Sequence, residues 1–341
     1  MNDQELQDAA KRLPKSIEPP VDLWPGILEK IRRGKVGRGG KRRGWGRWTV
    51  WAPLAAAAGL AGILLLRPRG ETWAVQRVAG SPHIDDTPLG SSGTMRVGQW
   101  LVTDDSSRAT IAVGAIGRVD VQPGTRIRLV RAAATDHRLA LAVGGIHAKV
   151  DAPPRLFFVD TPAGTAVDLG CEYTLETDAS GRGRLHVTGG YVEFAWNGAR
   201  SVVPIDAYAE TRPGHPPGIP YVSDAPAALV TALDAFAFGS GGVAAERAAL
   251  TAARSEDAIS LWHLLSRVDA QERGAVYDRL ASLVPPPPGV TRAGALALEQ
   301  QTLDRYWGRI ERIHFRIVVL RGVRTIDART GEAKKSVSGE R

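Results

Sequence analysis

The side chains that could perform catalysis or bind a metal are scattered along the sequence. Two His residues spaced as HExxH or HxxxH would share one face of a helix and could bind zinc, but the seven His residues include no such pair. We therefore expect each to be a surface or strand residue, and we predict no metal, no cofactor and no enzymatic activity. The seven are His83, His137, His147, His186, His215, His263 and His314.

The cysteine content and the paired acids narrow the chemistry further. A single cysteine, Cys171, excludes an internal disulfide, a Cys-X-X-Cys redox pair and a Cys-rich zinc site within this chain. Asp85-Asp86 and Asp104-Asp105 are adjacent carboxylates beside turn residues. Such pairs can bind calcium or act as a carboxylate dyad, but acids are also common in solvated turns, and we favour the turn interpretation.

Positive charge is concentrated near the N-terminus. The chain has 44 Lys and Arg against 36 Asp and Glu, and residues 1–48 hold 12 of these bases with only 6 acids. Nine of the 12 lie between Lys30 and Arg47, in a Gly-rich run before an uncharged stretch. The run resembles RNA-binding Arg-Gly segments in composition, but we favour a juxtamembrane linker attracted to anionic membrane lipid. No direct nucleic-acid partner is expected.

The uncharged stretch, Trp48–Leu66, has the length and composition of a transmembrane helix. Its 19 residues would extend over about 28 Å, close to the hydrocarbon thickness of a bilayer. Trp45, Trp48 and Trp51 lie at its N-terminal edge as interfacial membrane anchors, and Arg67 follows its other end. The bases on the N-terminal side predict that the N-terminus is cytoplasmic and that most of the chain lies outside the cytoplasm.

Two other interpretations of Trp48–Leu66 are a cleaved signal peptide and a buried core helix. A signal peptide here would have an n-region of more than 40 residues. It would also end at small residues, whereas this stretch ends in three Leu residues and Arg67. We therefore favour a single membrane-spanning helix over residues 48–66.

Residues 1–47 are predicted to be a cytoplasmic segment that binds a partner. A helix beginning near residue 22 would place Leu23, Trp24, Ile27, Leu28 and Ile31 on one apolar stripe. Such a short helix is marginal alone in water, and the segment has no domain of its own to bury the stripe. We therefore predict that these five residues form the partner-binding site.

From residue 73 to residue 212 the sequence alternates apolar and polar residues in short runs between turn signals such as Pro123-Gly124 and Asn197-Gly198. The clearest alternation has Val167 at one end and Leu175 at the other, and we predict it to be one half-buried strand with Cys171 on its buried face. Strands that recur about every 8 to 12 residues indicate an antiparallel β-sandwich or roll.

Particular runs within this β-rich region resemble the FecR family. The most specific are V-D-T-P-A-G (Val159–Gly164) and L-G-C-E-Y-T-L (Leu169–Leu175), and the run from Gly98 to Val113 is also similar. The sequence departs from the family at Cys171, where Thr or Ser is expected. In that family the domain lies in the periplasm behind one transmembrane helix and regulates an extracytoplasmic-function (ECF) sigma factor. Leu13–Ile27 resembles the cytoplasmic tails of membrane-bound anti-sigma proteins.

After residue 224 the alternation stops, and Ala, Leu and Glu become frequent. We predict an α-helical region over residues 224–320, because apolar residues there recur at helical spacing. The polar residues 321–341 are predicted to be a disordered tail. The predicted helices span about residues 226–238, 244–254, 256–268, 271–284 and 292–312.

The resemblance and the charge pattern together imply an anti-sigma-like transmembrane regulator of the bacterial inner membrane. It would relay a periplasmic signal to a cytoplasmic ECF-type sigma factor. Besides the sigma factor, the expected partners are membrane lipid and an outer-membrane or periplasmic signalling protein. The alternative is an envelope scaffold or a glycan- or ligand-binding module that is anchored by one transmembrane helix. The apolar stripe in residues 23–31 favours the regulator, because a mere anchor does not need it.

Overall fold

The computed structural model describes residues 72–321. These residues all belong to one compact unit of the chain, Arg67–Arg341. The segments predicted for residues 1–47 and 48–66, and the tail from residue 322 onward, lie outside the described residues. Within the described residues, a β-rich region comes first and a helical region follows it, as the sequence predicted.

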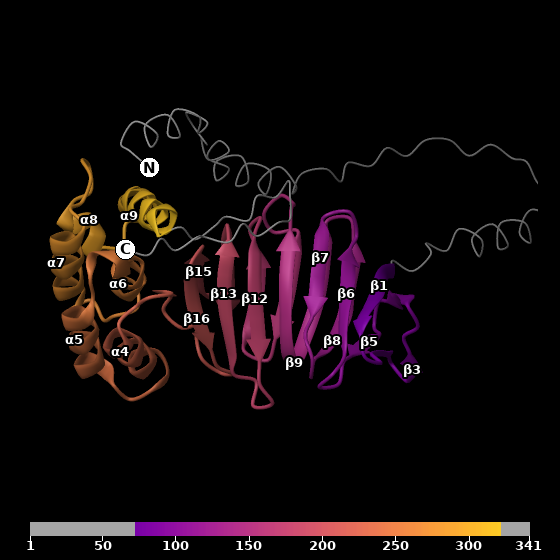
Figure 1. The fold of residues 1–341 in the computed structure, drawn as a ribbon. Helices are drawn as coiled ribbons and strands as arrows, with labels where there is room; N and C mark the ends of the chain where they lie inside the picture. Colours follow the sequence, from indigo (N-terminus) through magenta and orange to yellow (C-terminus); the bar gives the residue numbers. More distant parts are fainter. Residues whose placement is uncertain (1–71, 322–341) are drawn as a thin grey trace, which may run out of the picture. The chain divides into compact units, whose positions relative to one another are not determined.

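The β-rich region consists of two sheets that both contain the long strand β9 (Figure 1). Sheet A has the strand order β4-β1-β6-β7-β9-β12-β13-β16-β17 and is antiparallel throughout. Its strands are β4 (Ser92–Arg96), β1 (Thr72–Ala79), β6 (Arg108–Val113), β7 (Gly117–Val121), β9 (Asp136–Val150), β12 (Glu172–Thr177), β13 (Gly183–Gly189), β16 (Ala207–Thr211) and β17 (Tyr221–Val222).

Sheet B has the order β3-β2-β5-β8-β9-β10-β11-β14-β15, and only its β9–β10 pair is parallel. β15 is therefore an edge strand with one neighbour in the sheet. The further strands of sheet B are β3 (Thr87–Pro88), β2 (His83–Ile84), β5 (Trp100–Val102), β8 (Arg126–Ala133), β10 (Phe157–Thr161), β11 (Gly164–Asp168), β14 (Tyr191–Trp196) and β15 (Ala199–Pro204).

β9 changes sheets at Gly144. Its first half pairs with β8 and β10 in sheet B, and its second half pairs with β7 and β12 in sheet A. Gly144 has φ +97°, and a Cβ atom there would lie 2.3 Å from the Thr125 hydroxyl oxygen. Only glycine fits this bend. The Thr125 hydroxyl accepts a hydrogen bond from the backbone N–H of Gly145 at 2.9 Å, which fixes the crossing.

Alternate residues of both sheets point into one continuous hydrophobic core. Sheet A contributes side chains that are fully or almost fully buried, among them Val119, Ile146, Tyr173, Leu175 and Val187. Sheet B contributes a matching set from its own strands, among them Leu101, Ile127, Leu139, Phe157 and Phe194. The core continues into the helical region, so the two regions form one packed body.

The run from Val167 to Leu175, predicted as one strand, is two strands in different sheets. β11 ends at Asp168 and β12 begins after Cys171. Between them Gly170 has φ +90° and donates its N–H to the Asp168 carboxylate at 2.7 Å, so the backbone turns here. The predicted apolar face is not one face in the structure: Ala166, not Val167, belongs to the core in β11, whereas Tyr173 and Leu175 belong to it in β12. Cys171 is buried, as predicted, but it precedes the strand.

The helical region lies beside β15 and β16, at the opposite end of the sheets from β1 and β3 (Figure 1). One predicted helix, residues 292–312, is two helices. Leu298 between them adopts φ +54°, a conformation that ends a right-handed helix even though Leu favours helices. The helices are α4 (Ala227–Phe238), α5 (Gly242–Ala252), the short 3₁₀-helix η1 (Ser255–Asp257), α6 (Ala258–Leu265), α7 (Arg273–Leu283), α8 (Arg292–Leu296) and α9 (Gln300–Leu320).

Within residues 72–321, no helix combines the length and the apolar character that crossing a membrane requires. The predicted spanning helix lies outside that range, so the single-pass topology stays a prediction.

Candidate functional site

The residues that the sequence singled out for binding lie outside the described residues. They are the partner-binding residues Leu23, Trp24, Ile27, Leu28 and Ile31 and the membrane anchors Trp45, Trp48 and Trp51. The described residues instead contain a set of polar contacts, some buried and some exposed, where the helical region meets the sheets. We call this set the sheet–helix junction.

One side of α9 is hydrogen bonded to the ends of the strands. The Tyr191 hydroxyl of β14 donates to the Glu311 carboxylate at 2.6 Å. The Nε2 atom of His314 donates to the carbonyl oxygen of Ile205, in the turn between β15 and β16, at 2.7 Å. Burial lowers the pKa of His314. Because a carbonyl oxygen can only accept, this hydrogen bond requires a proton on Nε2. These contacts fix the orientation of α9.

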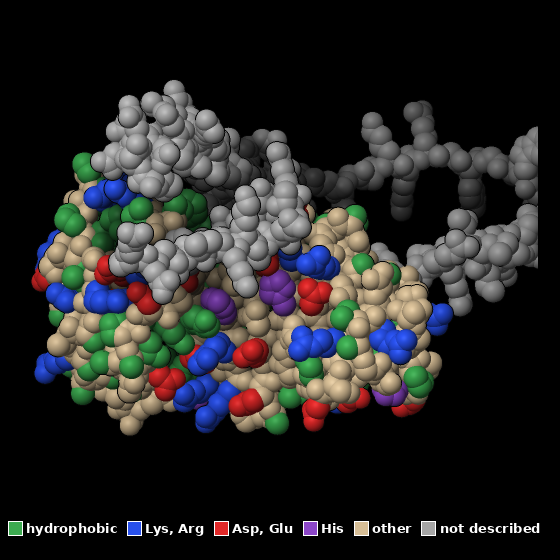
Figure 2. All heavy atoms as spheres, in the orientation of Figure 1, with side chains coloured by type: hydrophobic (Ala, Val, Ile, Leu, Met, Phe, Trp, Pro, Cys, Tyr) green, Lys and Arg blue, Asp and Glu red, His purple; other side chains and the backbone are tan. Residues whose placement is uncertain are grey.

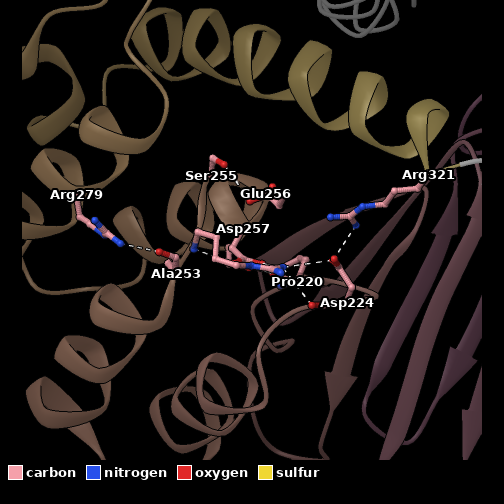
Figure 3. Close-up of polar contacts among 10 residues, drawn as sticks. Pro220, Asp224, Ala253, Ser255, Glu256, Asp257, Arg279 and Arg321 are labelled. Atoms are coloured by element: carbon pink, nitrogen blue, oxygen red, sulfur yellow. Dashed lines mark hydrogen bonds and ion pairs between the residues drawn. The ribbon is translucent and has the colours of Figure 1, made fainter.

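The C-terminal end of α9 joins a cluster of ion pairs around Asp224 (Figure 3). The Arg321 guanidinium lies 2.7 Å from the Asp224 carboxylate, and that of Arg254 lies 3.3 Å from the same group. Arg254 also pairs with the fully buried Asp257 at 2.9 Å. Hydrogen bonding to Asp257 raises the pKa of Arg254. The cluster links α9 and η1 to the loop that follows β17.

Three further hydrogen bonds close the junction from the helical side, and Figure 3 shows the one between Arg279 and Ala253. Arg279 of α7 donates to the carbonyl oxygens of Ala253 at 2.7 Å and Leu250 at 2.9 Å, which have no partner within α5. The Ser260 hydroxyl of α6 donates to the carbonyl oxygen of Pro220 at 2.7 Å. The helices are therefore attached to one another as well as to the sheets.

The free edge of β15 is covered by α6 and the turn after it. The Val202 N–H donates to Nε2 of His263 at 3.2 Å. Arg267 donates to the carbonyl oxygen of Arg200 at 3.0 Å and to the Ser201 hydroxyl at 3.0 Å. An uncovered edge strand invites pairing with another chain. The junction removes that edge from sheet B.

A second polar cluster lies on the outer face of sheet A. One row of paired residues crosses seven strands there, and Figure 2 shows His, acidic and basic side chains on this face. His147 lies between two carboxylates, 3.7 Å from Asp120 and 3.1 Å from Glu172. The neighbouring Asp120 carboxylate raises the pKa of His147. The row is Thr110, Asp120, His147, Thr174, His186, Tyr208 and Tyr221.

A groove of about 360 Å³ lies between sheet A and α4. Its polar groups are already paired with one another: Glu210 accepts from Arg184 and from the Tyr221 hydroxyl, each at 2.8 Å, and Asp234 pairs with Arg212 at 2.7 Å.

The acidic pairs behave as turn residues. The Asp85 carboxylate accepts the Trp100 N–H at 2.9 Å, and the Asp104 carboxylate accepts the Ser106 N–H at 2.8 Å. The turn interpretation is therefore confirmed. Across residues 72–321, no group of three or more His, Cys, Asp or Glu side chains is arranged to hold a metal ion.

Cys171 lies against a buried carboxyl group. Its thiol donates to the Asp168 carboxylate, and Cys171 is 5% exposed. Burial raises the pKa of Asp168 to about 6 and also raises the pKa of the Cys171 thiol. The thiolate is the reactive form of cysteine, so we expect this buried thiol with its raised pKa to be unreactive. The prediction that Cys171 is a small core residue is confirmed.

Comparison with known proteins finds a family model that matches part of the β-rich region. Residues 99–193 match the family model described as FecR protein, which confirms the FecR resemblance of the sequence. Two crystal structures of a candidate anti-sigma factor from Parabacteroides distasonis ATCC 8503 are similar to the chain at 15% identity and a TM-score of 0.32. The similar parts are 39% of this chain and 63% and 62% of those chains, so this chain spans less than two thirds of their length. No curated protein matches the chain.

Sequence reasoning did not find the sheet–helix junction. Tyr191 and Glu311 are 120 residues apart, and Ile205 and His314 are 109 apart, so no local spacing joins them. One signal was available: His263 lies within an apolar helical stripe, where a His residue needs a hydrogen-bond partner if it is buried.

Proposed function

We propose that the chain is an anti-sigma-like regulator anchored by one transmembrane helix in the bacterial inner membrane. Its FecR domain would lie in the periplasm, and its first 47 residues would bind an ECF-type sigma factor in the cytoplasm. The observation that carries this proposal is the FecR match at residues 99–193, which follows a basic cluster and an uncharged stretch of 19 residues.

The apolar stripe in residues 23–31 provides the partner contact in this proposal. A helix of about 12 residues is marginal in water, so the stripe would become ordered when a groove on the sigma factor accepts it. Trp24 and Ile27 would be the anchors, each contributing on the order of 2 kcal/mol to binding. A regulator needs such a contact, whereas an envelope scaffold does not.

The sheet–helix junction supports a relay that acts through the whole external region. Hydrogen bonds and ion pairs attach α9, α6 and η1 to the ends of β14, β15 and β17. A signalling protein that binds either region would therefore act on both as one body. The signal would then pass to the span through residues 67–71, which directly precede β1.

Topology tests the first half of the proposal. A reporter enzyme that is active only in the periplasm, fused after residue 341, should be active in intact cells. The same fusion to a reporter that is active only in the cytoplasm should be silent. The opposite pattern would overturn the assigned orientation.

The partner tests the second half. The full chain, purified from detergent-solubilised membranes of its own organism, should retain an ECF-type sigma factor in amounts close to one per chain. A variant that lacks residues 1–47 but keeps residues 48–341 should retain none. If the two proteins retain the same partners, the envelope-scaffold alternative replaces the regulator.

A further inference from the structure

The last three turns of α9 have an outward side that no described residue covers. It carries Arg and large apolar side chains at a spacing that places them on the same side of the helix. We call this set the α9 outer face. Its residues are Arg309, Arg312, Phe315, Arg316, Val319 and Leu320, all exposed.

The arginines of the α9 outer face have no ion-pair partner among the described residues. The acids of α9 are used elsewhere: Asp304 accepts from Gln300 at 2.6 Å, and Glu311 accepts from Tyr191 on the inner side. Three guanidinium groups spaced three and four residues apart therefore face outward together. The face is a concentrated positive surface.

The same face holds an uncommon concentration of exposed apolar side chains. Phe315 is 47% exposed, Val319 53% and Leu320 74%. These are three of the six large hydrophobic residues that are exposed within residues 72–321, and the other three are Val residues on other elements. Clustered exposed apolar residues beside charged ones mark an interaction surface.

The inner side of α9 keeps this face in a fixed orientation. Glu311, His314 and Arg321 attach the helix to β14, to the β15–β16 turn and to Asp224. The buried residues Ile310 and Val318 lie on that inner side. The outer face is therefore preformed. Binding of a partner does not have to order the backbone of α9, so no entropy is lost there.

We propose that the α9 outer face docks on the anionic phospholipid surface of the membrane in which the chain is anchored. Guanidinium groups bind phosphate oxygens bidentately, and apolar side chains beside them can enter the boundary between headgroups and acyl chains. Phe315, Val319 and Leu320 favour a lipid surface over an acidic protein, because charge recognition alone does not need them.

The short connection to the predicted span makes this contact geometrically available. Only residues 67–71 separate Leu66 from the start of β1, and five residues extend at most about 18 Å. The N-terminal end of β1 would therefore stay close to the bilayer. Because α9 is at the opposite end of the sheets from β1 (Figure 1), the contact requires that the sheets lie along the membrane surface. This step rests on the proposed topology, whereas the character of the α9 outer face does not.

A fluorescent probe on the face tests the proposal with the full chain. The variant Val319→Cys is labelled with an environment-sensitive dye, since the buried Cys171 stays unlabelled in the folded protein. The chain is placed in nanodiscs of neutral phosphatidylcholine or of phosphatidylcholine with phosphatidylglycerol. We expect a blue shift of the emission in the anionic discs alone. No shift in the anionic discs, or an equal shift in neutral ones, overturns the proposal.

A matched pair of variants assigns the effect to the arginines. Arg309→Gln, Arg312→Gln and Arg316→Gln together should abolish the blue shift. The control changes three exposed arginines on other elements, Arg77, Arg96 and Arg182, to Gln and should keep it. A shift that survives the first triple change, or that an added acidic protein produces without anionic lipid, contradicts recognition of lipid headgroups.

The proposed membrane anchor and the proposed docking face are tested separately. Incorporation through residues 48–66 is scored by co-elution of the chain with the discs. If the chain does not incorporate, the proposed anchor is wrong, and the labelled chain is titrated with vesicles of the same two compositions. Anionic vesicles should then still bind, with affinity that falls about fivefold per arginine removed, on the order of 100-fold for the triple variant. If the labelled chain does not bind the anionic vesicles, the proposed docking by the α9 outer face is overturned.

Discussion

The imidazole of His263 occupies the place of a missing neighbouring strand beside Val202. Its Nε2 atom accepts the Val202 N–H at 3.2 Å, and its Nδ1 atom donates to the carbonyl oxygen of Ile259 at 2.9 Å. Both contacts together require the neutral ring with its proton on Nδ1. Burial lowers the pKa of His263 to about 4. One buried histidine therefore joins α6 to the edge of sheet B.

This pKa predicts that acid destabilises the folded region of residues 72–321 through His263. The unfolded chain has an ordinary His pKa near 6.5, so between pH 6.5 and pH 4 it binds a proton that the folded state does not. As the pH drops through this window, protonation of His263 should lower the free energy of unfolding by on the order of 3 kcal/mol. Above pH 6.5, His263 should cause no change. Urea unfolding of the Arg67–Arg341 unit at pH 7.5 and pH 4.5 measures the change. The variant His263→Gln keeps one donor and one acceptor but does not titrate. Most of the destabilisation that His263 causes between the two pH values should therefore be absent from this variant.

Removing the His263 ring should destabilise the protein at neutral pH as well. His263→Ala leaves the Val202 N–H and the Ile259 carbonyl without their partners and opens a cavity. We expect a loss of about 2 to 4 kcal/mol in the free energy of unfolding at pH 7.5. The exposed His215 provides the control, because His215→Ala should cost less than about 0.5 kcal/mol. Equal losses in both variants would mean that α6 does not cover β15 as described.

Asp168 should act with the opposite sign. Its folded pKa of about 6 lies above the ordinary value of 3.8, so its contribution is fully present below pH 3.8 and is lost as the pH rises through 6. Asp168→Asn keeps an acceptor for the Gly170 N–H and cannot ionise. The variant should therefore be more stable relative to the parent at pH 7.5 than at pH 4, by up to about 3 kcal/mol. A difference that does not depend on pH would show that Asp168 is not desolvated.

Cys171 should not react in the folded protein. It is 5% exposed, and burial raises the pKa of its thiol. A maleimide or a disulfide reagent at pH 7.5 should leave the native chain unlabelled and should label one thiol per chain in denaturant. Rapid labelling of the native chain would place the turn between β11 and β12 at the surface.

The contacts of α9 predict where the helix opens first. Tyr191→Phe removes the hydrogen bond to Glu311, and Arg321→Ala removes the ion pair with Asp224. Each change should cost about 1 kcal/mol or less, since Arg321 is 28% and Asp224 46% exposed. Hydrogen exchange should quicken in α9 and remain unchanged in β12 and β13. Faster exchange throughout both sheets would contradict a local attachment.

The order of a β-rich region followed by helices could be predicted from the sequence, because the periods of two and of 3.6 residues are visible locally. The spacing of apolar residues did not show the turn within Val167–Leu175, because residues on both sides of it are buried. Val167–Leu175 keeps its alternation across the Gly170 turn, so two strands resemble one. The break at Leu298 was invisible for a similar reason, since the residue itself favours a helix.

The junction could not be predicted, because its geometry depends on distant partners. Tyr191 meets Glu311, and Val202 meets His263, only once both sheets and α6 and α9 are in place. The α9 arginines were visible in the sequence at helical spacing. Which side of the helix is buried became known only from the packing of Ile310, His314 and Val318 against the rest of the fold.

The central claim is that residues 1–47 hold a sigma factor through the apolar stripe, and one paired substitution tests it most directly. The full chain is purified from membranes as wild type, as Trp24→Ala with Ile27→Ala, and as a control with Glu29→Ala and Arg33→Ala on the opposite side of the predicted helix. The two stripe anchors should together lower the affinity for the sigma factor by on the order of 10³-fold.

Wild type and control should therefore retain the sigma factor, the stripe variant should lose it, and sigma-dependent transcription should change in the stripe variant alone. All three chains should insert equally into the membrane and give the same thermal transition for the external region. Retention of the sigma factor by the stripe variant, or its absence from the wild type, would contradict the account.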